Sequence, residues 1–163
     1  MGILTEDMKR VVRENRLGFY ATVCPDGTPN LSPKGSTIIY DDDHLAFVDL
    51  GSPGTLSNLE RNPSIEISMV DLFVRKGYRF KGTATIVTGG SVFEGILNSY
   101  QGSAVQELIS GVRSAVLVKI ERALPLTSPG YLPGVTEGEM RGQWEQHWEQ
   151  VTRDYHGQPA KQS

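Results

Sequence analysis

The chain has 163 residues, of which 38% are hydrophobic and 21% charged, and this composition fits a globular protein with one buried core. A formal net charge of −3 gives no attraction to nucleic acid or to an anionic membrane surface, so we expect neither as a partner. Its single cysteine, Cys24, suits a reducing cytoplasm, and no segment approaches the roughly 20 apolar residues of a membrane span.

The N-terminal residues predict a helix and then a hairpin. Thr5 caps a helix that runs to about Asn15, with acidic residues in its first turn. Leu17 to Val23 predicts a strand, and the Pro and Gly of residues 25–28 favour a reversal. Pro29 to Ser36 therefore returns antiparallel to the first strand.

The chain then continues as a meander. Residues 37–40 extend the second strand, residues 41–43 make an acidic turn, and His44 to Leu50 forms a third strand. A loop at 51–55 leads into a short helix from Leu56 to about Arg61, which Asn62-Pro63 ends. Hydrophobic periodicity then predicts two strands, a helix and a sixth strand, at residues 65–70, 78–87, 91–109 and 115–120.

The composition changes after Pro125. Residues 128–134 form a linker rich in Pro and Gly, and Thr136 with Glu139 makes a capping box for a C-terminal helix. That helix carries an apolar stripe whose two tryptophans need a partner surface, and residues 156–163 are expected to be a loose tail. We expect this C-terminal part, 126–163, to pack on the domain formed by residues 1–125.

Six antiparallel strands with short connections most economically close into a barrel, because closure removes unpaired strand edges. The expected fold is therefore mainly β, a six-stranded antiparallel split barrel with a few peripheral helices. A barrel of this size has no interior room for a large ligand. Any cofactor must lie outside it, and in such barrels it often lies against a second subunit.

The first candidate site interrupts the second strand at Ser32, Pro33, Lys34, Gly35 and Ser36. Pro33 cannot donate to a ladder, and Gly35 has no side chain to pack. A flat ring lying along this strand, with Lys34 supplying positive charge, explains both residues. A β-bulge that bends the sheet explains them equally well.

The second candidate site is the loop that opens the short helix. Free amides near Ser52 and Gly54, with the Thr55 hydroxyl and Asn58 one turn later, are suited to hold a phosphate. Alternatively, Ser52 or Thr55 is only a helix N-cap, and Asn58 then lies on the surface.

Other chemistries lack a pattern in this sequence. The three histidines are isolated, the acidic turn at 41–43 is typical of a solvated hairpin, and we expect no metal site. No G-x-S-x-G elbow, G-x-G-x-x-G or P-loop is present. No side chain stands out as a catalytic acid or base.

Several segments together resemble the pyridoxamine 5′-phosphate oxidase-like FMN-binding split-barrel family, over about residues 5 to 125. The resemblance rests on five motifs in a fixed order, namely Leu17-Gly18-Phe19-Tyr20-Ala21-Thr22-Val23, Asp26-Gly27-Thr28-Pro29-Asn30, Ser32-Pro33-Lys34-Gly35, the run from Thr55 to Pro63, and Tyr78-Arg79-Phe80-Lys81-Gly82-Thr83-Ala84.

The resemblance implies a homodimer with FMN in grooves between the subunits. It places Ser32 to Ser36 beside the isoalloxazine, the stretch Val48, Asp49 and Leu50 near it, and the loop with Thr55 and Asn58 at the phosphate. It also implies that the partner subunit contributes aromatic or basic residues, for which Tyr131 and Trp144 are candidates; core packing of the C-terminal helix is the alternative role of both.

The chain departs from the family at two places. Gly54 stands where small relatives often have a basic residue, which leaves Lys34, with Arg79 or Lys81, to balance the phosphate. The Trp- and Arg/His-rich ending of true oxidases is not reproduced at residues 142–149, so we expect no vitamin B6 oxidase activity.

The function expected from this resemblance is that of an FMN-dependent oxidoreductase acting on a small-molecule redox substrate. Two alternatives stay open at this point. One is a non-catalytic flavin-binding or electron-carrier protein, and the other is a member of the same fold that binds a deazaflavin or haem.

Overall fold

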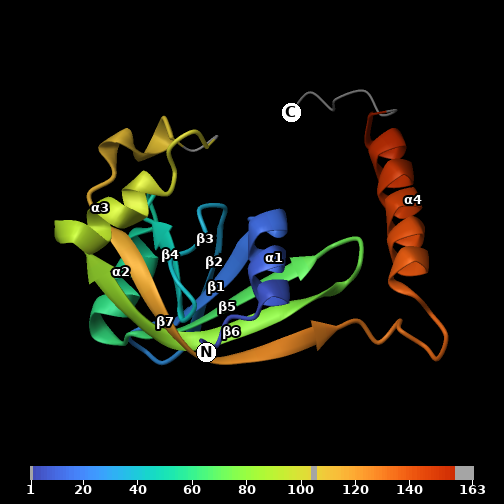
Figure 1. The fold of residues 1–163 in the computed structure, drawn as a ribbon, viewed down its shortest axis with the longest axis horizontal. Helices are drawn as coiled ribbons and strands as arrows, with labels where there is room; N and C mark the ends of the chain where they lie inside the picture. The colour runs from blue at the N-terminus through green and yellow to red at the C-terminus, as the bar shows by residue number, and fades with distance from the viewer. Residues whose placement is uncertain (1, 104–105, 157–163) are drawn as a thin grey trace.

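The computed structural model describes residues 2–103 and 106–156, and their centre is one antiparallel sheet (Figure 1). Its strands follow the order β2-β1-β5-β6-β7-β4-β3. The strands are β1 Gly18–Val23, β2 Pro29–Lys34, β3 Ile38–Ile39, β4 His44–Val48, β5 Ser64–Asp71, β6 Lys76–Val87 and β7 Ala115–Thr127. The helices are α1 Glu6–Asn15, α2 Pro53–Arg61, α3 Gly90–Asn98 and α4 Glu137–His156, with a short 3-10 helix at Leu108–Gly111.

The two edge strands of the sheet, β2 and β3, are neighbours in sequence. Only residues 35–37 separate them, so the sheet has to curl until its edges approach each other. This curled antiparallel sheet confirms the mainly β split-barrel fold. It has seven strands, one more than expected.

The additional strand arises because the expected strand over residues 29–40 is broken. Lys34 pairs with Gly18, the first residue of β1, so β1 offers no further partner beyond this point. The chain leaves that ladder and Ile38 pairs instead with Ala46 of β4. The interruption at Gly35 therefore transfers the chain from one end of the sheet to the other.

Several other element boundaries differ from the sequence prediction: α2 begins at Pro53 instead of Leu56, β4 ends at Val48 instead of Leu50, and the largest differences are at α3 and β7. The expected helix over 91–109 ends at Asn98, and Gly102 has a φ of 74°, which a helix does not accommodate. The strand expected at 115–120 runs on to Thr127, because β7 pairs with β6 along its whole length around an irregularity between Lys81 and Gly82.

The predicted helix caps at both ends of the chain are confirmed. The Met8 amide donates to Thr5 Oγ1 over 3.3 Å. At α4, the Glu139 amide donates to Thr136 Oγ1 over 3.2 Å, and the Thr136 amide donates to Glu139 Oε2 over 2.8 Å. The expected tail at 156–163 lies outside the described residues, apart from the backbone at 156.

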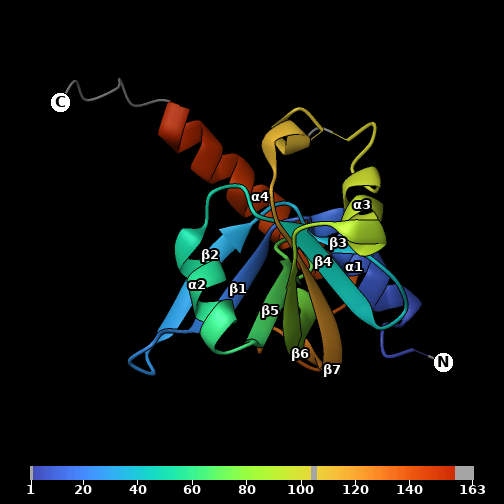
Figure 2. The same ribbon diagram turned by 90° about the vertical axis from the view of Figure 1, so that its left-hand side faces the viewer.

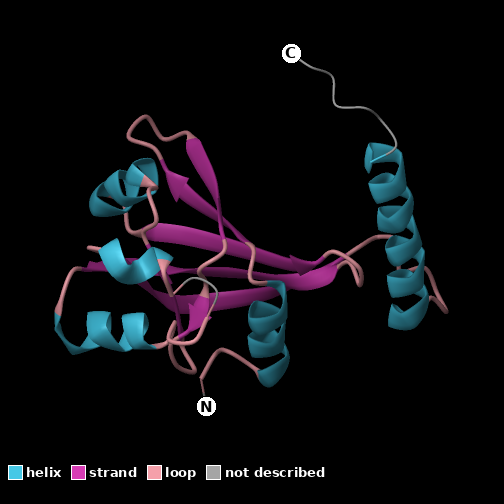
Figure 3. Cartoon of the chain, turned by 90° about the horizontal axis from the view of Figure 1, so that it is seen from above, coloured by secondary structure: helices cyan, strands magenta, loops and turns pink. Residues whose placement is uncertain are grey.

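The C-terminal helix α4 stands beside the far ends of β5, β6 and β7 (Figures 1 and 3). Met140 near its start is 3% exposed, whereas Trp148 further along is 39% exposed. The apolar stripe of α4 is therefore covered at its first turns and open beyond them. No helix in the part of the chain that the structure describes is long and apolar enough to cross a membrane.

The buried side chains form two clusters. The larger cluster lies inside the curled sheet and includes Tyr20, Phe47 and Phe80, with α1 packed against it. The smaller cluster lies under α3, where Ile96 and Tyr100 meet Val48 of β4. Helix α2 packs beside β1 (Figure 2), so its first residues lie near the end of β2.

Candidate functional site

Lys34, the last residue of β2, points inward. Side chains alternate along β2, so Ser32 and Lys34 share one face and the exposed Pro33 takes the other. Only 7% of Lys34 is exposed. Its Nζ lies 5.9 Å from the centroid of the Tyr20 ring and 5.4 Å from that of Phe47, both inside the cation–π range.

The Lys34 ammonium joins the two candidate segments. It donates to Ser52 Oγ over 2.7 Å and to Ser32 Oγ over 3.3 Å. Among the described residues no carboxylate forms an ion pair with it. Asp49 is the nearby acid, and its Oδ1 accepts the amides of Ser52 at 2.8 Å and Gly51 at 3.2 Å.

Burial lowers the pKa of Lys34, and the negative charge of Asp49 opposes this effect. A buried cation that is hydrogen-bonded only to hydroxyl groups lacks a matching negative charge. The site therefore favours an anion, and a phosphate or the polar edge of a flavin has this character.

Helix α2 begins beside this ammonium. Ser52 occupies its N-cap, but the Ser52 hydroxyl accepts from Lys34 and makes no capping hydrogen bond. The Ser52 carbonyl accepts hydrogen bonds from the amides of Thr55 and Leu56. Gly54 comes before these residues, in the first turn, where backbone amides have no acceptor within the helix. The positive end of the α2 dipole adds to the positive charge of Lys34.

Both glycines of the candidate site face open space. A Cβ placed on Gly35 or on Gly54 would meet no heavy atom within 4 Å. The backbone at both positions is thus accessible to a flat or phosphorylated ligand. Together with the unpaired charge of Lys34, this accessibility fits the requirements of FMN.

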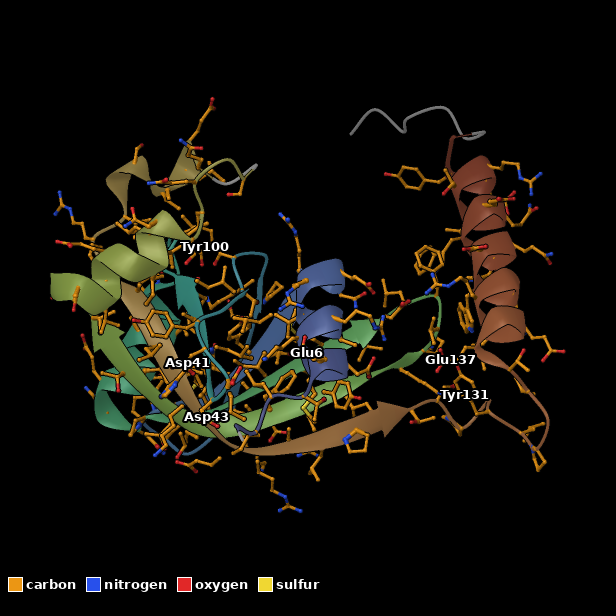
Figure 4. All side chains as sticks on the ribbon, in the orientation of Figure 1. Glu6, Asp41, Asp43, Tyr100, Tyr131 and Glu137 are labelled. Atoms are coloured by element: carbon orange, nitrogen blue, oxygen red, sulfur yellow. The ribbon has the colours of Figure 1, made fainter. Side chains whose placement is uncertain are left out.

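Hydrogen bonds fix the segment between β2 and β3. Ser36 Oγ donates to the Val48 carbonyl over 3.3 Å, which joins the expected ring strand to the end of β4. The Tyr100 hydroxyl (Figure 4) donates to the Ser36 carbonyl. Tyr20 shares a hydrogen bond with Thr37. Beyond Val48, Leu50 is 47% exposed.

Two of the expected phosphate ligands are less accessible than the sequence suggested. Thr55 is 3% exposed and Asn58 is 5% exposed. Asn58 Nδ2 donates to Thr22 Oγ1 over 3.0 Å and lies 3.7 Å from Cys24 Sγ. Asn58 therefore attaches α2 to β1 in the first hairpin. It does not lie on the surface, which was the alternative expected from the sequence.

The structure brings Ser32, Lys34 and Ser52 into direct contact, with Asp49 bonded to the same loop. Sequence reasoning did not find Tyr20, Phe47 or Tyr100 as supports of this site. The alternation of buried and exposed side chains along residues 17–23 places Tyr20 inward. This alternation was the one sequence signal that could have identified Tyr20 as a support of the site. Tyr100 is 64 residues from Ser36, and no sequence pattern joins them.

The other basic and aromatic candidates have partners elsewhere. Arg79 and Lys81 both pair with Glu66 on the sheet. The Tyr131 hydroxyl donates to the Val74 carbonyl over 2.6 Å, and Trp144 stacks 4.0 Å from the Arg75 guanidinium carbon. The contacts of Tyr131 and Trp144 hold α4 and its linker on the β5–β6 turn of the same chain.

The acidic turn at 41–43 also has local partners. Asp41 bonds His44 Nδ1 over 2.8 Å, and Asp43 accepts the Ile3 amide over 2.8 Å (Figure 4). Across residues 2–103 and 106–156, no three His, Cys, Asp or Glu side chains gather in a way that could hold a metal ion.

Comparisons with known proteins place this geometry in context. A family model described as pyridoxamine 5′-phosphate oxidase matches residues 4–126. The crystal structure of Group A Streptococcus HupZ aligns at 34% identity with a TM-score of 0.67, covering 77% of this chain and 96% of that chain. No relative is found among curated protein sequences.

More distant structures share the fold. An FMN-binding protein from Syntrophomonas wolfei has a TM-score of 0.66 at 16% identity, with 77% of this chain and 87% of that chain covered. A structure named F420 reductase has a TM-score of 0.55 at 20% identity, with 74% and 98% covered. The family match ends at residue 126, just before β7 ends at Thr127, so it does not include α4.

Proposed function

Because this chain belongs to the pyridoxamine 5′-phosphate oxidase family, we propose that it binds FMN and works as an FMN-dependent oxidoreductase on a small-molecule redox substrate. The observation that carries this proposal is the buried Lys34 ammonium. It has no carboxylate partner among the described residues and lies 2.7 Å from the serine that precedes α2. A phosphorylated flavin supplies the missing negative charge.

In this proposal the chain's own residues bind and orient the cofactor. Ser32 to Ser36 lies along the ring, with Val48 to Leu50 beside it. The α2 start with Ser52, Gly54 and Thr55 takes the phosphate, and Asn58 holds this helix start in place through its hydrogen bond to Thr22. Lys34 bridges the two parts, because its ammonium reaches Ser52 from β2. When bound, FMN supplies hydride or electron transfer.

We propose that a second copy of the chain completes the site. The outer face of the β2-β1 edge is apolar, with Phe19 opposite Pro33 and Ala21 opposite Leu31. Phe19 is 44% exposed and Leu31 is 64% exposed. A homodimer that buries this face removes its apolar side chains from water and brings the partner subunit beside the strand that carries Lys34.

We also propose that residues 1–125 form the FMN-binding domain and that 126–163 pack on it. Arg141 of α4 donates to Asp71 over 3.0 Å, and Lys76 pairs with Glu137 over 2.7 Å.

The lone Cys24 supports a cytoplasmic location. Since residues 142–149 lack the substrate-gripping ending of true oxidases, the proposed activity is not vitamin B6 oxidation.

A visible spectrum of the purified protein tests this proposal. We expect a yellow protein whose flavin absorbance is bleached by a reduced nicotinamide and restored by an added electron acceptor. Bound flavin that is never turned over supports an electron carrier instead. A Soret band would identify haem as the cofactor instead of FMN, and deazaflavin fluorescence would identify a deazaflavin. A colourless protein that leaves added FMN free contradicts the proposal.

A further inference from the structure

A cavity lies beside the β2–β3 connection, between α1 and α3. Its volume is about 330 Å³, within the size range of small-ligand pockets. Figure 1 shows β3 between these two helices. The lining residues come from α1, the β2–β3 segment and the end of α3, and are Val12, Arg13, Arg16, Gly35, Thr37, Ile38, Ile39, Ser99, Tyr100 and Ser103.

The lining of this pocket combines positive charge with an apolar wall. It contains two arginines, four hydroxyl groups and no acidic side chain. Arg13 and Arg16 form no ion pair with the described residues, whereas Arg10 in the same helix pairs with both Asp7 and Glu14. The guanidinium groups at the pocket mouth are thus available to an incoming anion.

A largely buried hydroxyl group also lines the pocket. Tyr20 is fully buried, and Thr37 Oγ1 is the one acceptor its hydroxyl reaches within the described structure. Thr37 is only 8% exposed and lines the pocket, where its hydroxyl adds a polar group to the wall.

We propose that this pocket binds a small organic anion, with its carboxylate or phosphate on Arg13 and Arg16 and its apolar body against Ile38 and Ile39. Gly35 lines the pocket and also belongs to the strand along which the flavin ring is proposed to lie. The ligand is therefore the substrate of the flavin, an assignment that rests on the proposed function. The anion site itself does not depend on it.

Isothermal calorimetry on the flavin-free protein tests the site, with benzoate and phenyl phosphate as probes and benzamide as the neutral analogue. We expect saturable binding of at least one anion, and benzamide about tenfold weaker or more. Arg13→Gln combined with Arg16→Gln should weaken anion binding about tenfold or more. The ratio of the affinities for benzoate and phenyl phosphate identifies carboxylate or phosphate as the preferred group.

One variant serves as a control. Arg61→Gln removes an exposed arginine from the last turn of α2, as Arg13 lies in the last turn of α1, and should leave probe affinity unchanged. A neutral analogue that binds as tightly as the anions, no saturable binding of either anion, or wild-type affinity in the double variant overturns the proposal.

The substrate assignment has its own readout. In the FMN-loaded protein, saturating benzoate or phenyl phosphate should shift the visible flavin spectrum, and the double arginine variant should lose this shift. Anion binding that leaves the spectrum unchanged overturns the assignment as substrate pocket. Failure of FMN to bind at all contradicts the proposed function instead, because the calorimetry on flavin-free protein still reports the anion site.

Discussion

Lys34 Nζ and Ser52 Oγ are 2.7 Å apart, although 18 residues separate them in sequence. This hydrogen bond connects the end of β2 to the residue that precedes α2. The ammonium is buried against Tyr20 and Phe47 and has no carboxylate partner in the described chain. The two candidate segments therefore form one positively charged site.

Replacing Lys34 by Met removes the charge and keeps most of the side-chain volume. We expect the affinity for FMN to fall about tenfold or more, equivalent to about 1.4 kcal/mol or more. The fold should survive, since the change removes a desolvated charge. Quenching of FMN fluorescence measures the affinity, and thermal unfolding measures the stability. Wild-type affinity in this variant removes Lys34 from the cofactor site.

The lowered pKa of Lys34 predicts opposite pH trends for binding and stability. FMN affinity should fall as the pH rises through the lowered pKa, before an ordinary lysine with a pKa of 10.5 titrates. Between these two pKa values the unfolded chain binds the proton and the folded chain does not, so the free energy of unfolding of flavin-free protein should rise with pH. Urea titrations and FMN titrations over this window check both trends, and Lys34→Met should show neither.

Thr55 is expected to contribute to phosphate binding and not to ring binding. Thr55→Val should weaken FMN binding about tenfold and leave riboflavin binding unchanged, because riboflavin lacks the phosphate. Thr152→Val, on the exposed surface of α4, makes the same substitution in a helix away from the site and should leave FMN binding unchanged. Equal losses for FMN and riboflavin, or no loss for FMN, would place the phosphate elsewhere.

Tyr100 is expected to position the segment between β2 and β3. Tyr100→Phe removes its hydrogen bond to the Ser36 carbonyl and should lower the free energy of unfolding by about 1 kcal/mol. It should also speed the release of FMN. Tyr40→Phe is the control, since the Tyr40 ring lies 3.7 Å from the Cβ position of Gly95 in α3 and its hydroxyl donates no hydrogen bond within the described residues. Stopped-flow fluorescence follows FMN release, and equal rates in both variants contradict a positioning role.

The proposed dimer face can be tested with two similarly exposed leucines. Leu31 on β2 is 64% exposed and Leu132 in the C-terminal linker is 67% exposed. Leu31→Asp should shift sedimentation from dimer to monomer and weaken FMN binding, because a charge is then desolvated in the interface. Leu132→Asp should change neither. A dimer that persists with Leu31→Asp places the interface on another face.

Much of the fold followed from local patterns in the sequence. The caps at Thr5 and Thr136 and the turn at 25–28 depend on residues close in sequence, so they were predictable. The break after Lys34 was not, because it depends on where β1 begins. The length of β7 also depends on a partner strand, β6, and not on its own residues.

The candidate site was predictable in its parts but not in its contacts. Pro33 and Gly35 marked an interrupted strand, and Gly54 marked a helix start, which local chemistry reveals. The contact of Lys34 with Ser52 depends on how the sheet curls. The support from Tyr100 and the burial of Asn58 likewise come from long-range packing that no short motif records.

Phosphorus NMR of FMN added to the purified protein tests most directly whether the β2 strand and the α2 start hold the same flavin nucleotide. We expect one bound phosphate resonance per chain, displaced from that of free FMN and returned toward it by both Lys34→Met and Thr55→Val. A resonance that stays at the position of free FMN in the wild-type protein would exclude a phosphate site formed by these two segments.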